Sequence, residues 1–94
     1  MNLHVILGVV VVVTYFGAFL IGAAALWKVR DDSYVYAVTF ASTTASLAFC
    51  FKYAGYVSSA EYTYVHGALT WAGLHILHGL ILCGFHVARF RGHL

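Results

Sequence analysis

Three long apolar stretches, separated by two short polar segments, make up almost the whole chain. They cover residues 3–27, 34–56 and 62–90, and each is long enough for a helix to cross a bilayer, which takes about 20 residues. Inside a bilayer the backbone must satisfy its own hydrogen bonds, so a helix is expected even over the β-branched run of residues 9–13. The pattern therefore predicts an all-α, integral membrane three-helix bundle, with residues 1–94 forming a single transmembrane unit.

The composition agrees with this pattern. Of the 94 residues, 63% are hydrophobic and only 9% are charged, and there is no proline. A soluble domain of this size has too little interior to bury so much apolar surface. The net charge of +2 comes from a few residues near the predicted helix ends, without a basic run. We therefore expect a membrane protein and no nucleic-acid partner.

The basic residues are divided unevenly between the two ends of the predicted bundle. Lys28, Arg30, Arg89 and Arg91 fall at one end, and Lys52 falls near the other. Under the positive-inside rule, this division predicts that the N-terminus is outside and the C-terminus is inside.

Short local signals predict how the helices begin and how they pack. Asp32 and Ser33 are both suited to cap the second helix. Ala18 and Gly22 are two small residues four positions apart, a spacing typical of close packing between membrane helices. We therefore expect a tight packing seam along this face of the first helix.

The two cysteines, Cys50 and Cys83, fall in the second and third stretches. At a rise of about 1.5 Å per residue, we expect their depths to differ by more than ~10 Å. A disulfide requires Cα atoms within about 7 Å of each other. The sequence therefore predicts two free, buried thiols that act as small apolar residues.

The third stretch carries four histidines, which are costly at membrane depth unless each has a partner or a function. His75 and His86 are eleven residues apart and lie on nearly the same helical face, with His78 about 60° away. His66 points away from them, near one end of the helix. We expect His75, His78 and His86 to form one polar stripe.

One hypothesis is structural: His75 and His78 are neutral and hydrogen-bonded inside the bundle or to a neighbouring subunit. The candidate partners are hydroxyls of the second helix, namely Thr43, Thr44 and Ser46. No Ser-His-Asp or Cys-His arrangement is expected at one depth, so we expect no catalysis by this chain alone.

A second hypothesis is haem b binding, as in a small cytochrome or a quinone-linked anchor subunit. A bis-histidine haem needs two imidazoles on opposite sides of one iron. His75 and His78 stand one turn apart on one helix and cannot serve as such a pair, whereas His4 and His66 share the outer end and could meet. The haem candidates are thus His75, His78, His66 and His4, and a haem shared between two copies remains open.

Two further possibilities concern metals and transport. No third or fourth ligand stands at the right height for zinc or copper, so no metal site is expected. A homo-oligomeric pore, with the histidine stripe facing its central axis and responding to pH, also remains open.

A short segment carries a family resemblance. Residues 73–78, Gly-Leu-His-Ile-Leu-His, resemble the T-G-x-H-G-x-H-V segment of subunit III of haem–copper oxidases of the cytochrome c type. Glu61 and Tyr64 stand at the distance of that family's upstream S-D-x-x-Y pattern, and Arg89 matches a basic residue after the histidine helix. The resemblance covers roughly residues 52–91 and is weak before them.

The segment also departs from the family. Ile76 replaces the glycine between the histidines, and Gly79 replaces the valine after them. Family helices one to three and seven have no counterpart, so the three spans resemble helices four to six of a reduced or split subunit. The side chains then expected to make structural polar contacts are His75, His78, His86, Glu61 and Tyr64.

The resemblance implies a non-catalytic accessory subunit of a respiratory terminal oxidase. It places haem and copper in partner subunits and no cofactor in this chain, apart from bound phospholipid. The implied partners are the catalytic subunit, other small membrane subunits and lipids, and the implied role is to support proton uptake linked to electron transport. The implied location is the bacterial cytoplasmic membrane or the mitochondrial inner membrane.

Overall fold

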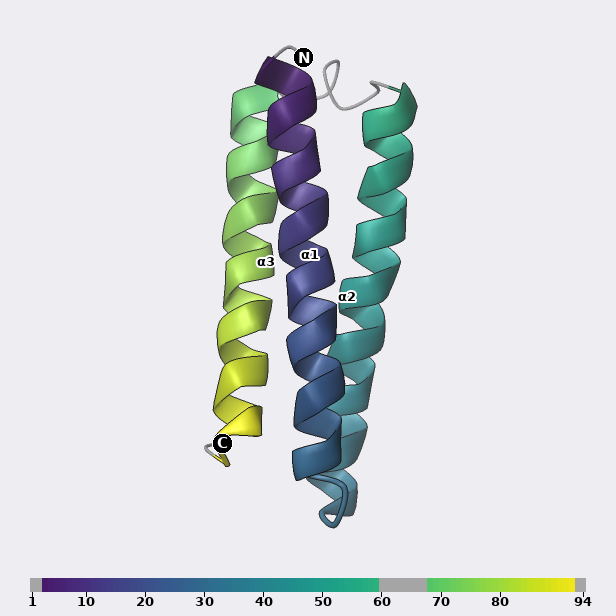
Figure 1. Ribbon diagram of the computed structural model, residues 1–94, viewed down its shortest axis with the longest axis vertical. Coiled ribbons are helices and arrows are strands. Elements are labelled where there is room, and N and C mark those ends of the chain that lie inside the picture. The colour runs from purple at the N-terminus through teal and green to yellow at the C-terminus, as the bar shows by residue number, and fades with distance from the viewer. Residues whose placement is uncertain (1–2, 60–67, 93–94) are drawn as a thin grey trace.

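The computed structural model describes residues 3–59 and 68–92. It contains three α-helices, α1 (Leu3–Lys28), α2 (Ser33–Ser59) and α3 (Ala68–Phe90) (Figure 1). All three are long and apolar enough to cross a membrane. The prediction of an all-α, three-helix membrane protein is confirmed.

The helix ends lie close to the predicted ones. Where both can be compared, they differ by at most three residues, at the end of α2. The predicted start of the third span at residue 62 lies outside the described residues. The backbone N–H of Val35 donates to Oδ1 of Asp32 at 3.1 Å, and Tyr36 N–H donates to the Asp32 carbonyl at 2.8 Å. Of the two candidate caps, Asp32 is therefore the one used.

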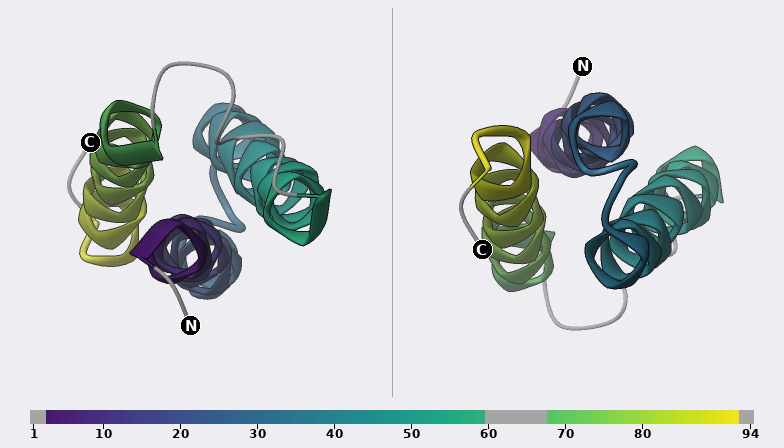
Figure 2. Two further views of the ribbon diagram at one scale, coloured as in Figure 1. Left: turned by 90° about the horizontal axis from the view of Figure 1, so that it is seen from above. Right: turned by 90° about the horizontal axis from the view of Figure 1, so that it is seen from below.

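The first helix lies between the other two. In Figure 1, α1 and α3 run in the same direction, and α2 runs in the opposite direction. Seen from either end, α2 and α3 flank α1 and touch each other much less than each touches α1 (Figure 2). The bundle extends 45 Å along its longest axis, which matches the about 40–45 Å of a bilayer with its headgroups.

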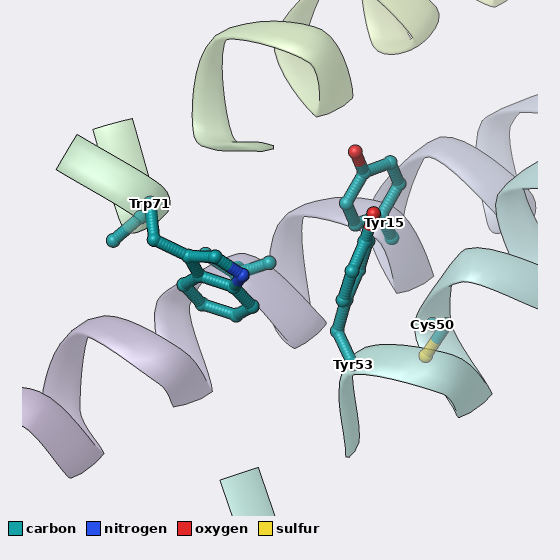
Figure 3. Close-up of a cluster of buried hydrophobic side chains, with 6 residues drawn as sticks. Tyr15, Cys50, Tyr53 and Trp71 are labelled. Atoms are coloured by element: carbon teal, nitrogen blue, oxygen red, sulfur yellow. The ribbon is translucent and has the colours of Figure 1, made fainter. Parts of the chain in front are cut away.

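An aromatic core joins the three helices in the half of the bundle where α3 begins. Tyr15 of α1, Tyr53 of α2 and Trp71 of α3 are buried and approach one another (Figure 3). The ring centroids of Tyr15 and Tyr53 are 5.4 Å apart, and those of Tyr53 and Trp71 are 5.5 Å apart and perpendicular. Such pairs are worth about 0.5–1.5 kcal/mol each. They matter here because, in lipid, packing replaces the hydrophobic effect as the force between helices.

The small-residue seam of α1 is also present. Ala18, Gly22 and Ala25 are buried. A Cβ atom added at Gly22 would lie 2.9 Å from the His86 ring and would overlap the Thr43 hydroxyl. Glycine at this position therefore allows both α2 and α3 to approach α1, and the predicted seam is confirmed.

The two cysteines are free, as predicted. Cys50 is buried, as predicted, whereas Cys83 is only partly buried, and the predicted difference in depth between them is wrong. The Cys50 thiol contacts the carbonyl of Val12 and the Cys83 thiol contacts that of Thr14, each at 3.7 Å. These carbonyls are two residues apart, only about 3 Å along α1. The nearly equal depth of the two thiols could not be predicted from residue counts along each helix, because it depends on how α2 and α3 pack against α1.

We predict that Gly22→Ala weakens the bundle by about 1–3 kcal/mol, because the added methyl group overpacks the seam. The matched control is Gly17→Ala, where an added Cβ meets no atom within 4 Å. The control should be neutral or slightly stabilising, since alanine has the higher helix propensity. Unfolding free energies measured in detergent by circular dichroism provide the comparison. Equal effects of the two substitutions would show that the seam is not tightly packed.

Candidate functional site

Three of the predicted site residues lie in the part of the chain that the structure describes in full: His75, His78 and His86, all on α3. Glu61, Tyr64 and His66, and the side chain of His4, lie outside the described residues. The possible pairing of His4 with His66 therefore stays a prediction.

His75 and His78 meet at one hydroxyl group. The Tyr15 Oη atom lies 2.6 Å from Nδ1 of His78 and 3.4 Å from Nδ1 of His75. Tyr15 itself is fully buried, so its hydroxyl has no access to solvent. The two histidines are thus attached to the central helix through a single side chain, and the bond to His78 is the shorter and stronger one.

The predicted partners of His75 and His78 were hydroxyls of α2, and this prediction is wrong, because the hydroxyl that they share belongs to α1. Thr43, Thr44 and Ser46 belong to α2, whereas α3 packs mainly against α1. The sequence did hold a signal for Tyr15. It precedes Ala18 by three residues and Gly22 by seven, so it lies on the same helical face as the packing seam.

The hydrogen-bonding capacity of a phenol decides what this cluster can do. A tyrosine hydroxyl has one proton to donate and two lone pairs to accept with, and a neutral imidazole carries its proton on only one nitrogen. Tyr15 can therefore donate to one Nδ1 and accept from the other, so the two neutral rings take opposite tautomers. The outward Nε2 atom is then a donor on one histidine and an acceptor on the other.

Neighbouring rings hold the two imidazoles in place. The His75 ring centroid is 4.3 Å from that of Tyr53 and 5.0 Å from that of Trp71. The His78 ring lies edge-on to Phe49 at 5.3 Å. His75 is half-buried, whereas His78 keeps an exposed edge on the outer surface of the bundle. Both imidazoles are therefore packed against aromatic rings, and His78 is accessible from outside the bundle.

His86 forms a second, separate connection near the opposite end. Its Nδ1 lies 2.7 Å from the Ala18 carbonyl oxygen, and its Nε2 lies 2.7 Å from the Ser42 hydroxyl. A carbonyl can only accept, so Nδ1 carries the proton and, in a neutral ring, Nε2 accepts from Ser42. One fully buried side chain thus links α3 to both α1 and α2, with both of its nitrogens satisfied.

The histidine stripe therefore faces α1. His75, His78 and His86 all bond to groups of α1, and His86 has no exposed surface. In a homo-oligomeric pore with this stripe on its central axis, the imidazoles would instead point away from their own bundle. The direction of the stripe argues against the pore hypothesis.

The same geometry bears on haem ligation. The Nδ1 atoms of His75 and His78 converge on one oxygen, so the two rings do not face each other across a plane that one haem could fill. Within the described ranges 3–59 and 68–92, no group of three or more histidine, cysteine, aspartate or glutamate side chains lies close enough together to hold a metal ion.

Comparisons with protein-family models, with curated proteins and with solved structures find no match to this chain. The resemblance to subunit III therefore depends only on the residues quoted above. The structure shows a small three-span membrane protein in which α3 is attached to α1 by histidine side chains.

We predict that Tyr15→Phe destabilises the bundle by about 0.6 kcal/mol, the average for hydrogen bonds between membrane helices, and by no more than ~1.7 kcal/mol, the largest value measured for one. The substitution keeps the ring but leaves both Nδ1 atoms without their shared partner. Tyr34→Phe is the matched control, because Tyr34 is 77% exposed. Thermal unfolding in detergent or bicelles measures the difference. An unchanged stability in Tyr15→Phe would mean that the hydroxyl contributes nothing to holding α3.

Proposed function

We propose that this chain is a non-catalytic membrane subunit of a respiratory terminal oxidase, similar to part of subunit III. It packs against the catalytic subunit and lipids and supports proton uptake linked to electron transport. Haem and copper belong to the partner subunits. The observation that carries the proposal is the His75–x–x–His78 pair of the family-like segment, which is bonded through Tyr15 inside the bundle.

The hydrogen bonds of α3 support a structural role for its histidines. His86 uses both ring nitrogens within the bundle, and His75 and His78 each use Nδ1 on Tyr15. Ring nitrogens that are hydrogen-bonded to a neighbouring helix position the helix that carries them. They fix how α3 rests on α1 and so determine which face of α3 is turned outward.

That outward face is suited to contact a larger membrane partner. Its large side chains are exposed by 57–71%: Leu69, Leu74, Leu77, Leu80 and Ile81. Gly73 and Gly84 are also exposed, and a Cβ atom at either would meet nothing within 4 Å. Small residues let a second helix approach closely, so this face suits a helix of another subunit, with lipid filling the rest.

Purification from the native membrane in mild detergent tests the proposal. A tagged chain should bring down a complex with a haem–copper oxidase spectrum. The double variant His75→Ala/His78→Ala should lower the amount of recovered complex, with the haem spectrum of the remainder unchanged. Phe40→Ala on α2, whose side chain is half exposed, is the control and should leave recovery unchanged. Recovery of the chain by itself, without a haem-containing partner, would refute the assignment.

One observation favours a second candidate, a small haem b-binding or quinone-linked anchor subunit. Histidines that ligate metals usually have the other ring nitrogen hydrogen-bonded. His78 has this arrangement, since Nδ1 is held by Tyr15 and the ring edge is exposed. Two copies facing each other through His78 would supply the two axial ligands of one haem.

A reduced-minus-oxidised spectrum of the purified, folded chain distinguishes this candidate. If it is correct, the spectrum has a b-type band that His78→Ala abolishes. His75→Ala, which leaves the Tyr15–His78 bond in place, should retain the band. A folded sample without a b-type band rules out the haem candidate and leaves the oxidase proposal standing.

A further inference from the structure

A cavity of about 310 Å³ lies at the end of the bundle, between the α1–α2 turn and the end of α3. This volume falls in the range of pockets that bind small molecules, about 300–1,000 Å³. The lining residues are Lys28, Val29, Asp31, Asp32, Val35, Arg89 and Gly92. Neither the histidine cluster nor the outward face of α3 includes any of them.

Arg89 is the unusual member of this lining. Its side chain is only 9% exposed, and within the described part of the chain its buried Nε atom has no hydrogen-bond partner. The guanidinium carbon lies 4.7 Å from the centre of the Phe85 ring. A buried cation without a paired anion is costly, because its lost hydration is not replaced. The cavity beside Arg89 is therefore suited to a negatively charged group.

Lys28 adds a second cation to the same cavity. Its Nζ atom lies 5.2 Å from the centre of the Phe90 ring. Arginine and lysine together are typical ligands of phosphate, because their hydrogen bonds to phosphate oxygens are assisted by charge. A phosphate in the cavity would supply Arg89 Nε with its missing acceptor.

Two carboxylates change which phosphate compound fits. Asp31 and Asp32 also line the cavity, so two cations and two carboxylates give the lining a formal charge of zero. Asp32 already caps α2 by accepting from Val35 N–H, whereas Asp31 stands on the exposed turn. A simple anion gains no net attraction there. A zwitterion with a phosphate and a hydrogen-bonding ammonium group complements both charges.

An apolar groove begins beside this cavity. Leu20, Ile21, Ala24 and Phe90 line a hollow of about 330 Å³ between α1 and α3. Phe90 connects it to the cavity, because it follows Arg89 in the chain and its ring lies next to the Lys28 ammonium. A charged cavity at the membrane end, continued by an apolar groove into the span, has the shape and chemistry of a phospholipid site.

We propose that the cavity binds a phospholipid whose headgroup carries a primary ammonium, of the phosphatidylethanolamine type. Arg89 and Lys28 hold the phosphate, Asp31 accepts from the ammonium, and one acyl chain lies in the groove. A phosphatidylcholine headgroup cannot donate a hydrogen bond to Asp31, because its quaternary ammonium has no N–H, so only the weaker ionic attraction remains. The inference uses only this chain, so it is independent of the oxidase assignment.

The test measures lipid binding to the purified, delipidated chain in detergent. Melting temperature and native mass spectrometry are the two readouts. Phosphatidylethanolamine should bind about tenfold more tightly than phosphatidylcholine with the same acyl chains, the ratio expected for one charge-assisted hydrogen bond. Inorganic phosphate alone should not raise the melting temperature at the same concentrations. If phosphate stabilises the chain as well as the lipid does, the ligand is a free anion and the proposal is wrong.

Substitutions assign the roles. Arg89→Gln and Lys28→Gln should each weaken binding of both lipids, and Asp31→Asn should remove the preference for the primary ammonium. Lys28 and Asp31 are exposed, so their variants remain informative if Arg89→Gln fails to fold. Arg91→Gln is the matched control, because Arg91 is exposed at the same end but does not line the cavity. Equal weakening by Arg91→Gln, or an unchanged preference in Asp31→Asn, would overturn the proposal.

Discussion

The structure depends on one constraint: a polar side chain inside a bilayer has no water to bond to. This constraint acts most strongly on the histidines of α3, because each imidazole has two nitrogens that need hydrogen-bond partners. Tyr15 and the Ala18 carbonyl provide such partners on α1, and Ser42 provides one on α2. Pairing these groups determines which face of α3 is turned inward.

The central position of α1 follows from this need for hydrogen-bond partners and from the small side chains along its seam. Small residues on its seam let α3 come close enough for His86 to reach a backbone carbonyl, which a larger side chain at Gly22 would prevent. A second close approach occurs at Gly79, where an added Cβ would lie 2.6 Å from the Thr14 side chain. Both contacts join residues 64 or 65 positions apart, as expected of two parallel helices held in one register. Polar bonds and close packing thus reinforce the same alignment.

The chemistry available to the chain is limited by how these groups are used. Ring nitrogens that hold helices together cannot also bind a ligand, so most of the histidine stripe serves the architecture. The exposed edge of His78 is the exception and is the reason to consider a haem shared between two copies. The opposite situation is found at the membrane end, where Arg89 is buried without a partner for Nε. The satisfied ring nitrogens therefore indicate a structural role, whereas the unpartnered Arg89 Nε, which lies beside a cavity, indicates a ligand.

Much of the fold was determined by the sequence alone. The length of the apolar stretches and the lack of an alternative to helix in lipid were enough to predict three spans. Residue spacing predicted the Ala18–Gly22 seam, and residue type named Asp32 as one of two candidate caps, with Ser33 as the other. Helical periodicity also placed His75, His78 and His86 on one stripe. These features are local, since they depend only on spacing within one helix.

Only the tertiary structure decided which helix the stripe faces. Periodicity within α3 cannot specify a neighbour, so the predicted partners on α2 were wrong and Tyr15 was overlooked, although its hydroxyl lies on the seam face. The levels of Cys50 and Cys83 were misjudged for the same reason. The cavity around Arg89 likewise brings together the α1–α2 turn and the end of α3, which are far apart in the chain. Relations between helices arise from packing and register, and spacing along one helix does not contain them.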